Sequence, residues 1–124
     1  MANELTISAK LRYNPDSKET PKVDLQNITP TGAKFVDSRQ SVGTSEEALQ
    51  LGELAGTTLG YGLLKVVGTD PTHWVDVKTA TGGVIFARVE WGKPLLLKFG
   101  SGVTAPFVIA SAAAVPFHFF IHEA

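Results

Sequence analysis

The sequence contains no cysteine and carries almost no net charge, and each absence excludes a class of protein. Without cysteine, the 124 residues can form no disulfide framework, no thiolate nucleophile and no cysteine-ligated zinc or iron–sulfur site. The 11 Lys and Arg residues nearly balance the 12 Asp and Glu residues, and the net charge of −1 removes the electrostatic basis for strong nonspecific nucleic-acid binding. We therefore expect no nucleic-acid partner and a fold stabilised by buried apolar surface or by neighbouring chains.

A clear targeting or membrane segment is also lacking. Residues 1–6 have neither a basic start nor a long apolar run, so we expect the mature chain to begin there and not after a cleaved secretory signal. No formal charge lies between Lys98 and Glu123, but glycine, serine and proline residues interrupt this stretch. The residues after each interruption alternate in polarity, which indicates two short buried strands and no membrane span.

Strand-forming residues are present along the whole chain. Valine, isoleucine, threonine and the aromatic residues account for 40 of the 124 positions, a share that favours sheets. In residues 4–13 the apolar positions alternate with polar ones, a period of two that predicts a strand with one solvent-facing side. The apolar positions of this segment are Leu5, Ile7, Ala9, Leu11 and Tyr13.

The same pattern predicts further strands, separated by turns rich in glycine, proline and aspartate. We expect them at residues 22–28, 33–42, 59–67, 73–78, 84–91, 95–99, 107–110 and 115–122. Parallel pairing would require crossover segments that the short connections do not provide, so the pairing should be antiparallel. The prediction is an all-β chain: one antiparallel β-sandwich or jelly-roll domain over residues 1–124, with eight or nine short strands and an exposed loop at residues 14–21.

One segment resembles a helix start. Residues 44–47, Thr-Ser-Glu-Glu, match a capping box, which predicts one or two helical turns through Leu49 and Leu51, ending at Gly52. A strand through residues 49–51 is the alternative. The fold should thus contain at most one short helix.

The histidines do not form a convincing metal site. His118 and His122 are four residues apart on a predicted strand, so they lie roughly 13 Å apart on one face, too far to share an ion. His73 follows Asp70 in a turn, and we interpret it as a turn residue and not a catalytic base. We predict no metal and no cofactor.

The carboxylates and glycines give no catalytic site either. Asp76 and Glu90 flank the predicted turn at residues 81–83, where we expect surface pairing with Lys78, Arg88 or Lys93 and not a glycosidase dyad. The glycine-rich segments at residues 60–62 and 100–102 lack the lysine and the following helix of a phosphate-binding loop. The prediction is a protein without catalytic residues, not an enzyme.

Four aromatic residues are the candidate ligand or partner contacts. Trp74, Trp91 and Tyr61 could form a flat platform on which sugar rings stack, although burial in a core or an interface is the commoner use of such residues. Phe120 falls between two residues that we expect on the buried face of the last strand, so it should point to the opposite face. The alternation therefore predicts that Phe120 is partly exposed or that a partner covers this second face. That strand should bury Phe117, Phe119 and Ile121 on one side and carry His118 and His122 on the other.

Four segments resemble the small virion-associated proteins of tailed bacteriophages. They are VGTSEEALQLG at residues 42–52, GYGLLK at residues 60–65, HWVDV at residues 73–77 and FHFFIHE at residues 117–123. The resemblance implies a non-enzymatic capsid decoration or cement protein, a homo-oligomeric jelly roll of the virion that is assembled in the host cytoplasm. Its partners would be the major capsid protein or other virion proteins. It assigns no single functional residue, because a cement protein acts through distributed contacts. The alternative function is a carbohydrate- or receptor-binding β-sandwich module of the tail or head fibre.

Overall fold

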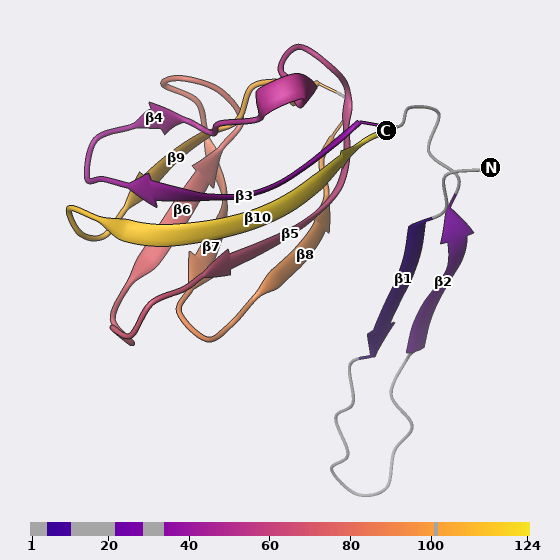
Figure 1. Cartoon of the computed structure of the whole chain (residues 1–124), viewed down its shortest axis with the longest axis horizontal. Coiled ribbons are helices and arrows are strands. Elements are labelled where there is room, and N and C mark those ends of the chain that lie inside the picture. Colours follow the sequence, from indigo (N-terminus) through magenta and orange to yellow (C-terminus); the bar gives the residue numbers. More distant parts are fainter. Residues whose placement is uncertain (1–4, 11–21, 29–33, 101) are drawn as a thin grey trace, which may run out of the picture. The chain divides into compact units, whose positions relative to one another are not determined.

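Ten strands and one short 3₁₀ turn make up the described part of the chain (Figure 1). The computed structural model describes residues 5–10, 22–28, 34–100 and 102–124, with side chains from residue 34 onward. The elements are β1 (Leu5–Lys10), β2 (Lys22–Ile28), β3 (Phe35–Val42), β4 (Glu47–Ala48), η1 (Gly52–Leu54), β5 (Leu59–Val66), β6 (Trp74–Lys78), β7 (Ile85–Glu90), β8 (Leu95–Lys98), β9 (Phe107–Ala110) and β10 (Val115–Glu123).

The chain divides into two units, Met1–Thr31 and Gly32–Ala124. In the first unit, β1 and β2 pair antiparallel, with Ile7 opposite Leu25. β2 matches the strand predicted at residues 22–28, and β1 covers residues 5–10 of the strand predicted at residues 4–13. Residue 4, residues 11–13 and the predicted loop at residues 14–21 lie outside the described residues. The single domain over residues 1–124 therefore stays a prediction.

The second unit is an antiparallel β-sandwich, which confirms the predicted fold class. One sheet has the strand order β3-β10-β5-β8 and the other has the order β4-β9-β6-β7. In the first sheet β10 lies between β3 and β5 (Figure 1). Phe119 of β10 is opposite both Ser38 and Leu64. The strands begin and end within about two residues of their predicted positions, because turn residues border each alternating segment.

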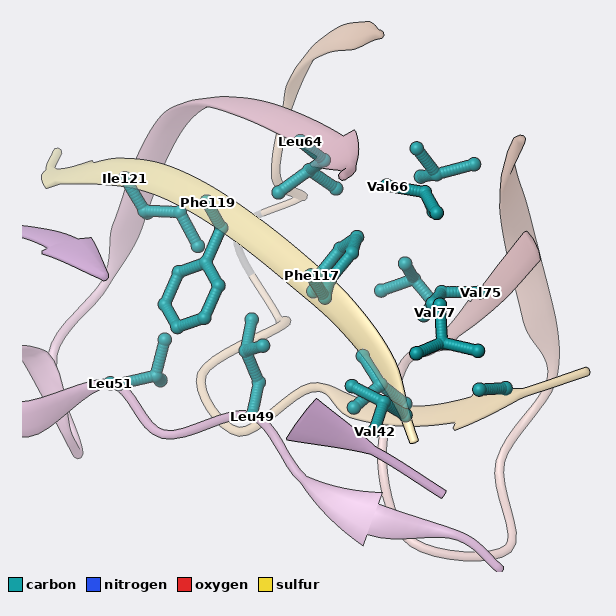
Figure 2. Close-up of a cluster of buried hydrophobic side chains, with 14 of the residues drawn as sticks. Val42, Leu49, Leu51, Leu64, Val66, Val75, Val77, Phe117, Phe119 and Ile121 are labelled. Atoms are coloured by element: carbon teal, nitrogen blue, oxygen red, sulfur yellow. The ribbon is translucent and has the colours of Figure 1, made fainter. Parts of the chain in front are cut away.

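The core lies between the two sheets and follows from the alternation within each strand. In β10 the predicted inward residues Phe117, Phe119 and Ile121 are fully buried, which confirms that prediction. They pack with valines of the opposite sheet, among them Val75 and Val77 (Figure 2). Burial of one such side chain contributes roughly 1.5–3 kcal/mol, so this double layer is the main source of stability.

The predicted helix at residues 44–52 is wrong. The chain there is extended: β4 pairs with β9, and Leu49 and Leu51 are buried with an exposed residue between them. The 3₁₀ turn η1 begins only at Gly52. The local capping pattern loses to tertiary structure. Glu47, the carboxylate three residues after Thr44, pairs in β4 with Val108 of β9 and accepts a 3.0 Å hydrogen bond from Nε2 of Gln40, so it does not cap its own segment.

The turn predicted at residues 81–83 joins β6 to β7. Gly82 has a positive φ of 65°, a conformation that glycine adopts without strain. Among the described residues, no helix has the length and apolar character to cross a membrane.

Candidate functional site

Trp74 and Trp91 line the same cleft. It lies where β6 begins and β7 ends, and it encloses about 480 Å³. Trp74 is the first residue of β6 and pairs with Glu90, the last residue of β7, so the strand pairing brings the two tryptophans together. The lining residues are Pro71, Thr72, His73, Trp74, Glu90, Trp91, Gly92 and Lys93.

Arg88 holds Trp74 in place. Its guanidinium carbon lies 3.8 Å from the centre of the indole ring, the geometry of a cation–π contact. The same guanidinium donates two hydrogen bonds to Asp76, from Nε to Oδ1 at 2.7 Å and from Nη2 to Oδ2 at 2.9 Å. These bonds raise the pKa of Arg88 above its ordinary value. Asp76 forms one of the expected ion pairs, but the expected surface position is wrong, since Asp76 is only 2% exposed.

Trp91 is fixed by two hydrogen bonds from its own N–H groups. The indole Nε1–H donates to the carbonyl oxygen of Gly68 at 2.9 Å, and the backbone N–H donates to the carbonyl oxygen of His73 at 3.0 Å. Trp91 nevertheless stays 37% exposed. An anchored and accessible indole is the arrangement that a stacking ligand needs.

The charged groups beside the tryptophans are paired with each other. Nε2 of His73 lies 3.3 Å from Oδ2 of Asp70, and Nζ of Lys93 lies 2.9 Å from Oε2 of Glu90. The bond from Lys93 lowers the pKa of Glu90, and hydrogen bonds from the side chain and backbone of Thr72 lower the pKa of Asp70. Both carboxylates are thus ionised hydrogen-bond acceptors, and the cleft offers polar contacts around aromatic surface.

Tyr61 lies elsewhere, so the three aromatic residues do not form one platform. Its ring stacks on His122 with 6.1 Å between the ring centres. Val66, at the far end of the same strand, forms a bridge to Trp91, and five strand residues span about 16 Å. Tyr61 alternates with the buried residues Gly62 and Leu64 of β5, so it lies on the outer face of the β3-β10-β5-β8 sheet, the side away from the core.

Phe120 lies on that same outer face, in a continuous row of apolar side chains. Phe35 stacks on Phe120 at 5.9 Å between ring centres, Leu63 is opposite Phe120, and Leu96 is opposite Leu63. Three of these side chains are largely exposed, Phe35 at 55%, Leu63 at 37% and Leu96 at 42%. We call these four residues the outer row.

Phe120 is partly exposed, which confirms one of the two outcomes predicted for it. The sequence interpretation missed its other members, Phe35, Leu63 and Leu96. Adjacent apolar residues within a short strand could have identified them. In Leu63-Leu64 and in Leu95-Leu96 only one residue of each pair can face the core, so the other must lie on the outer face.

No family model, curated protein or solved structure matches this chain. Among the described residues, no group of three or more His, Asp or Glu side chains could hold a metal ion.

Proposed function

We propose that this chain is a non-enzymatic structural protein of a tailed-phage particle, a decoration or cement subunit that stabilises the head by binding its major capsid protein or another virion protein. The outer row supports this proposal most directly. Monomeric proteins seldom leave several large apolar side chains contiguous on a regular sheet, and such patches mark surfaces that a partner covers. The resemblance to small virion proteins supplies the kind of partner.

The size of the outer face fits a subunit that binds in many copies. Strands β3 and β5 have eight residues, β10 has nine and β8 has four. With about 4.8 Å between strands, the face measures roughly 19 Å across and about 26 Å along β3 and β5. That footprint is below the roughly 800 Å² per partner of a stable pairwise interface. A single contact would thus be weak, and symmetric repetition on a shell would provide the strength through avidity.

Purified particles test the proposal. The protein should remain with intact virions at high copy number through density-gradient purification, and particles that lack it should release DNA at lower temperature or after milder osmotic shock. Particles complemented with the wild-type chain serve as the control. Recovery of the protein only from infected-cell lysate, with none in purified particles, would contradict the proposal.

A carbohydrate- or receptor-binding module is the second candidate, and the shared cleft of Trp74 and Trp91 favours it. The exposed indole of Trp91 could stack on a sugar ring while Glu90 and His73 accept or donate hydrogen bonds. Saturable binding on a glycan array that is lost in Trp91→Ala and in Trp74→Ala would support this function. Phe35→Ala is the matched control, because it removes an exposed aromatic ring outside the cleft. Binding that survives both tryptophan changes would reject the cleft.

A further inference from the structure

In the described part of the chain, lysine and arginine side chains form ion pairs on one side of the sandwich and none on the other sheet. On the β4-β9-β6-β7 side, three ion pairs join an amino or guanidinium nitrogen to a carboxylate oxygen within 2.9 Å, in Lys78–Glu46, Arg88–Asp76 and Lys93–Glu90. Arg39, Lys65 and Lys98 lie on β3, β5 and β8 of the other sheet. They form no ion pair with any residue in the described part of the chain.

The strand register places these three cations around the outer row. Lys65 shares the outer face of β5 with Leu63, and Lys98 shares the outer face of β8 with Leu96. Because β5 and β8 are antiparallel and Leu63 is opposite Leu96, Lys65 and Lys98 lie on opposite sides of the row. Arg39 is level with Lys65 across the sheet. The apolar centre is therefore bordered by positive charge on two sides.

The one carboxylate among the outward-facing positions of this sheet is already engaged. Oδ1 of Asp37 lies 2.6 Å from Nε2 of His118 on the neighbouring strand. Within the described residues, no carboxylate therefore pairs with the three cations, and Nζ of Lys98 makes only a 3.4 Å hydrogen bond to the carbonyl oxygen of Phe99. Charge complementarity with an incoming partner would select that partner and speed its association.

We infer that the outer row receives a segment of another virion protein in which apolar side chains are bordered on both sides by Asp or Glu. This inference rests on the proposed function and adds the chemistry of the partner. The apolar residues of that segment cover Phe35, Leu63 and Leu96, and its carboxylates pair with Lys65 and Lys98.

Other occupants of the outer row fit the charges less well. In a face-to-face pairing with a second copy, unpaired cations would meet unpaired cations, which costs free energy. Recruitment to anionic lipid generally uses clusters of four to eight basic residues, and this face has three. A net charge of −1 disfavours a nucleic acid.

Rebinding to depleted heads tests the inference. Heads stripped of the protein are mixed with wild-type chain or with Leu63→Ser, Lys65→Glu, Lys98→Glu or Val84→Ser, and the bound protein is measured by co-sedimentation at increasing NaCl. We expect wild-type binding to weaken as salt rises, and the first three variants to bind about tenfold more weakly or worse. Val84→Ser is the matched control, since Val84 is 74% exposed but lies outside the outer row.

The outcomes separate the two proposals. If wild-type chain does not bind stripped heads at all, the proposed function fails. If wild-type chain binds but salt and all three variants leave the affinity unchanged, the inference is overturned while the proposed function stands. Saturable binding to vesicles of phosphatidylglycerol, or self-association in the ultracentrifuge, that Leu63→Ser abolishes would also overturn it. Thermal melts of each variant show whether lost binding reflects lost folding, and the two lysine variants remain informative if Leu63→Ser unfolds.

Discussion

Nε2 of His122 accepts a 3.0 Å hydrogen bond from the backbone N–H of Tyr61, and the imidazole ring covers Gly60. A β-carbon on Gly60 would lie within 3.0 Å of three imidazole atoms. We therefore expect Gly60→Ala to displace the ring, break this hydrogen bond and lower the free energy of unfolding by about 1–3 kcal/mol. Urea denaturation measures the change.

Gly100→Ala is the control for this variant. No atom lies within 4 Å of a β-carbon at Gly100, and the conformation there carries no positive φ. Its unfolding midpoint should stay close to that of the wild-type chain. Equal midpoints for both alanine variants would contradict the role assigned to His122.

Glu46 should make stability depend on pH in the acid range. A hydrogen bond from Lys78, followed by one from the backbone N–H of Gly82, lowers the pKa of this carboxyl from 4.5 to about 2. As the pH falls, the carboxyl of Glu46 therefore binds its proton first in the unfolded chain. The stabilisation from this carboxylate is complete above about pH 4.5 and is lost progressively toward pH 2. Denaturant unfolding between pH 6 and 2 should show a shallower decline for Glu46→Gln than for the wild-type chain. Superimposable curves would show that the pair contributes nothing.

The pair of Arg88 and Asp76 gives a second stability prediction. Removing the guanidinium in Arg88→Leu leaves a carboxylate that is 2% exposed without its partner. We expect the free energy of unfolding to fall, but by less than for a fully buried pair, because Arg88 itself is half exposed. The double variant Arg88→Leu/Asp76→Val should recover part of that loss, since no charge stays unpaired. A double variant that is less stable than Arg88→Leu would contradict this account.

Two phenylalanines distinguish the core from the outer row. Phe119→Ala should lower the free energy of unfolding by about 3–5 kcal/mol, because it leaves a cavity between the sheets. The same substitution at Phe35 should change it by less than about 1 kcal/mol, since that ring is mostly exposed on the free chain. Differential scanning calorimetry of both variants makes the comparison. A large loss at Phe35 would mean that the outer row stabilises the subunit itself, which argues against a surface reserved for a partner.

Local pattern was sufficient to predict the strands and the buried side of β10. The buried residues of β10, Phe117, Phe119 and Ile121, alternate with partly exposed ones. An alternation of this kind between two turns indicates a strand with one buried face. The same locality explains the failure of the helix predicted at residues 44–52. The capping pattern spans only four residues, whereas Glu47 pairs with Val108 of the distant strand β9 and accepts a hydrogen bond from Gln40.

The candidate sites could be predicted only in part, because they depend on strand pairing. Sequence identified Trp74, Trp91, Tyr61 and Phe120 as single aromatic candidates. It could not show that two of them share a cleft while the other two lie on the outer face of the opposite sheet. The outer row was even harder to predict from the sequence. Its members come from four strands whose order in the sheet differs from their order in the chain.

That order of strands has a consequence for how the protein forms. β10 is the last strand of the sandwich to be synthesised, yet it lies between β3 and β5 and joins residues as distant as Asp37 and His118, 81 positions apart. Until β10 arrives, β3 and β5 have no common neighbour and their edges stay open to wrong pairing. The sheet therefore closes late and through distant contacts, which makes folding slow and leaves the unfinished chain prone to aggregation.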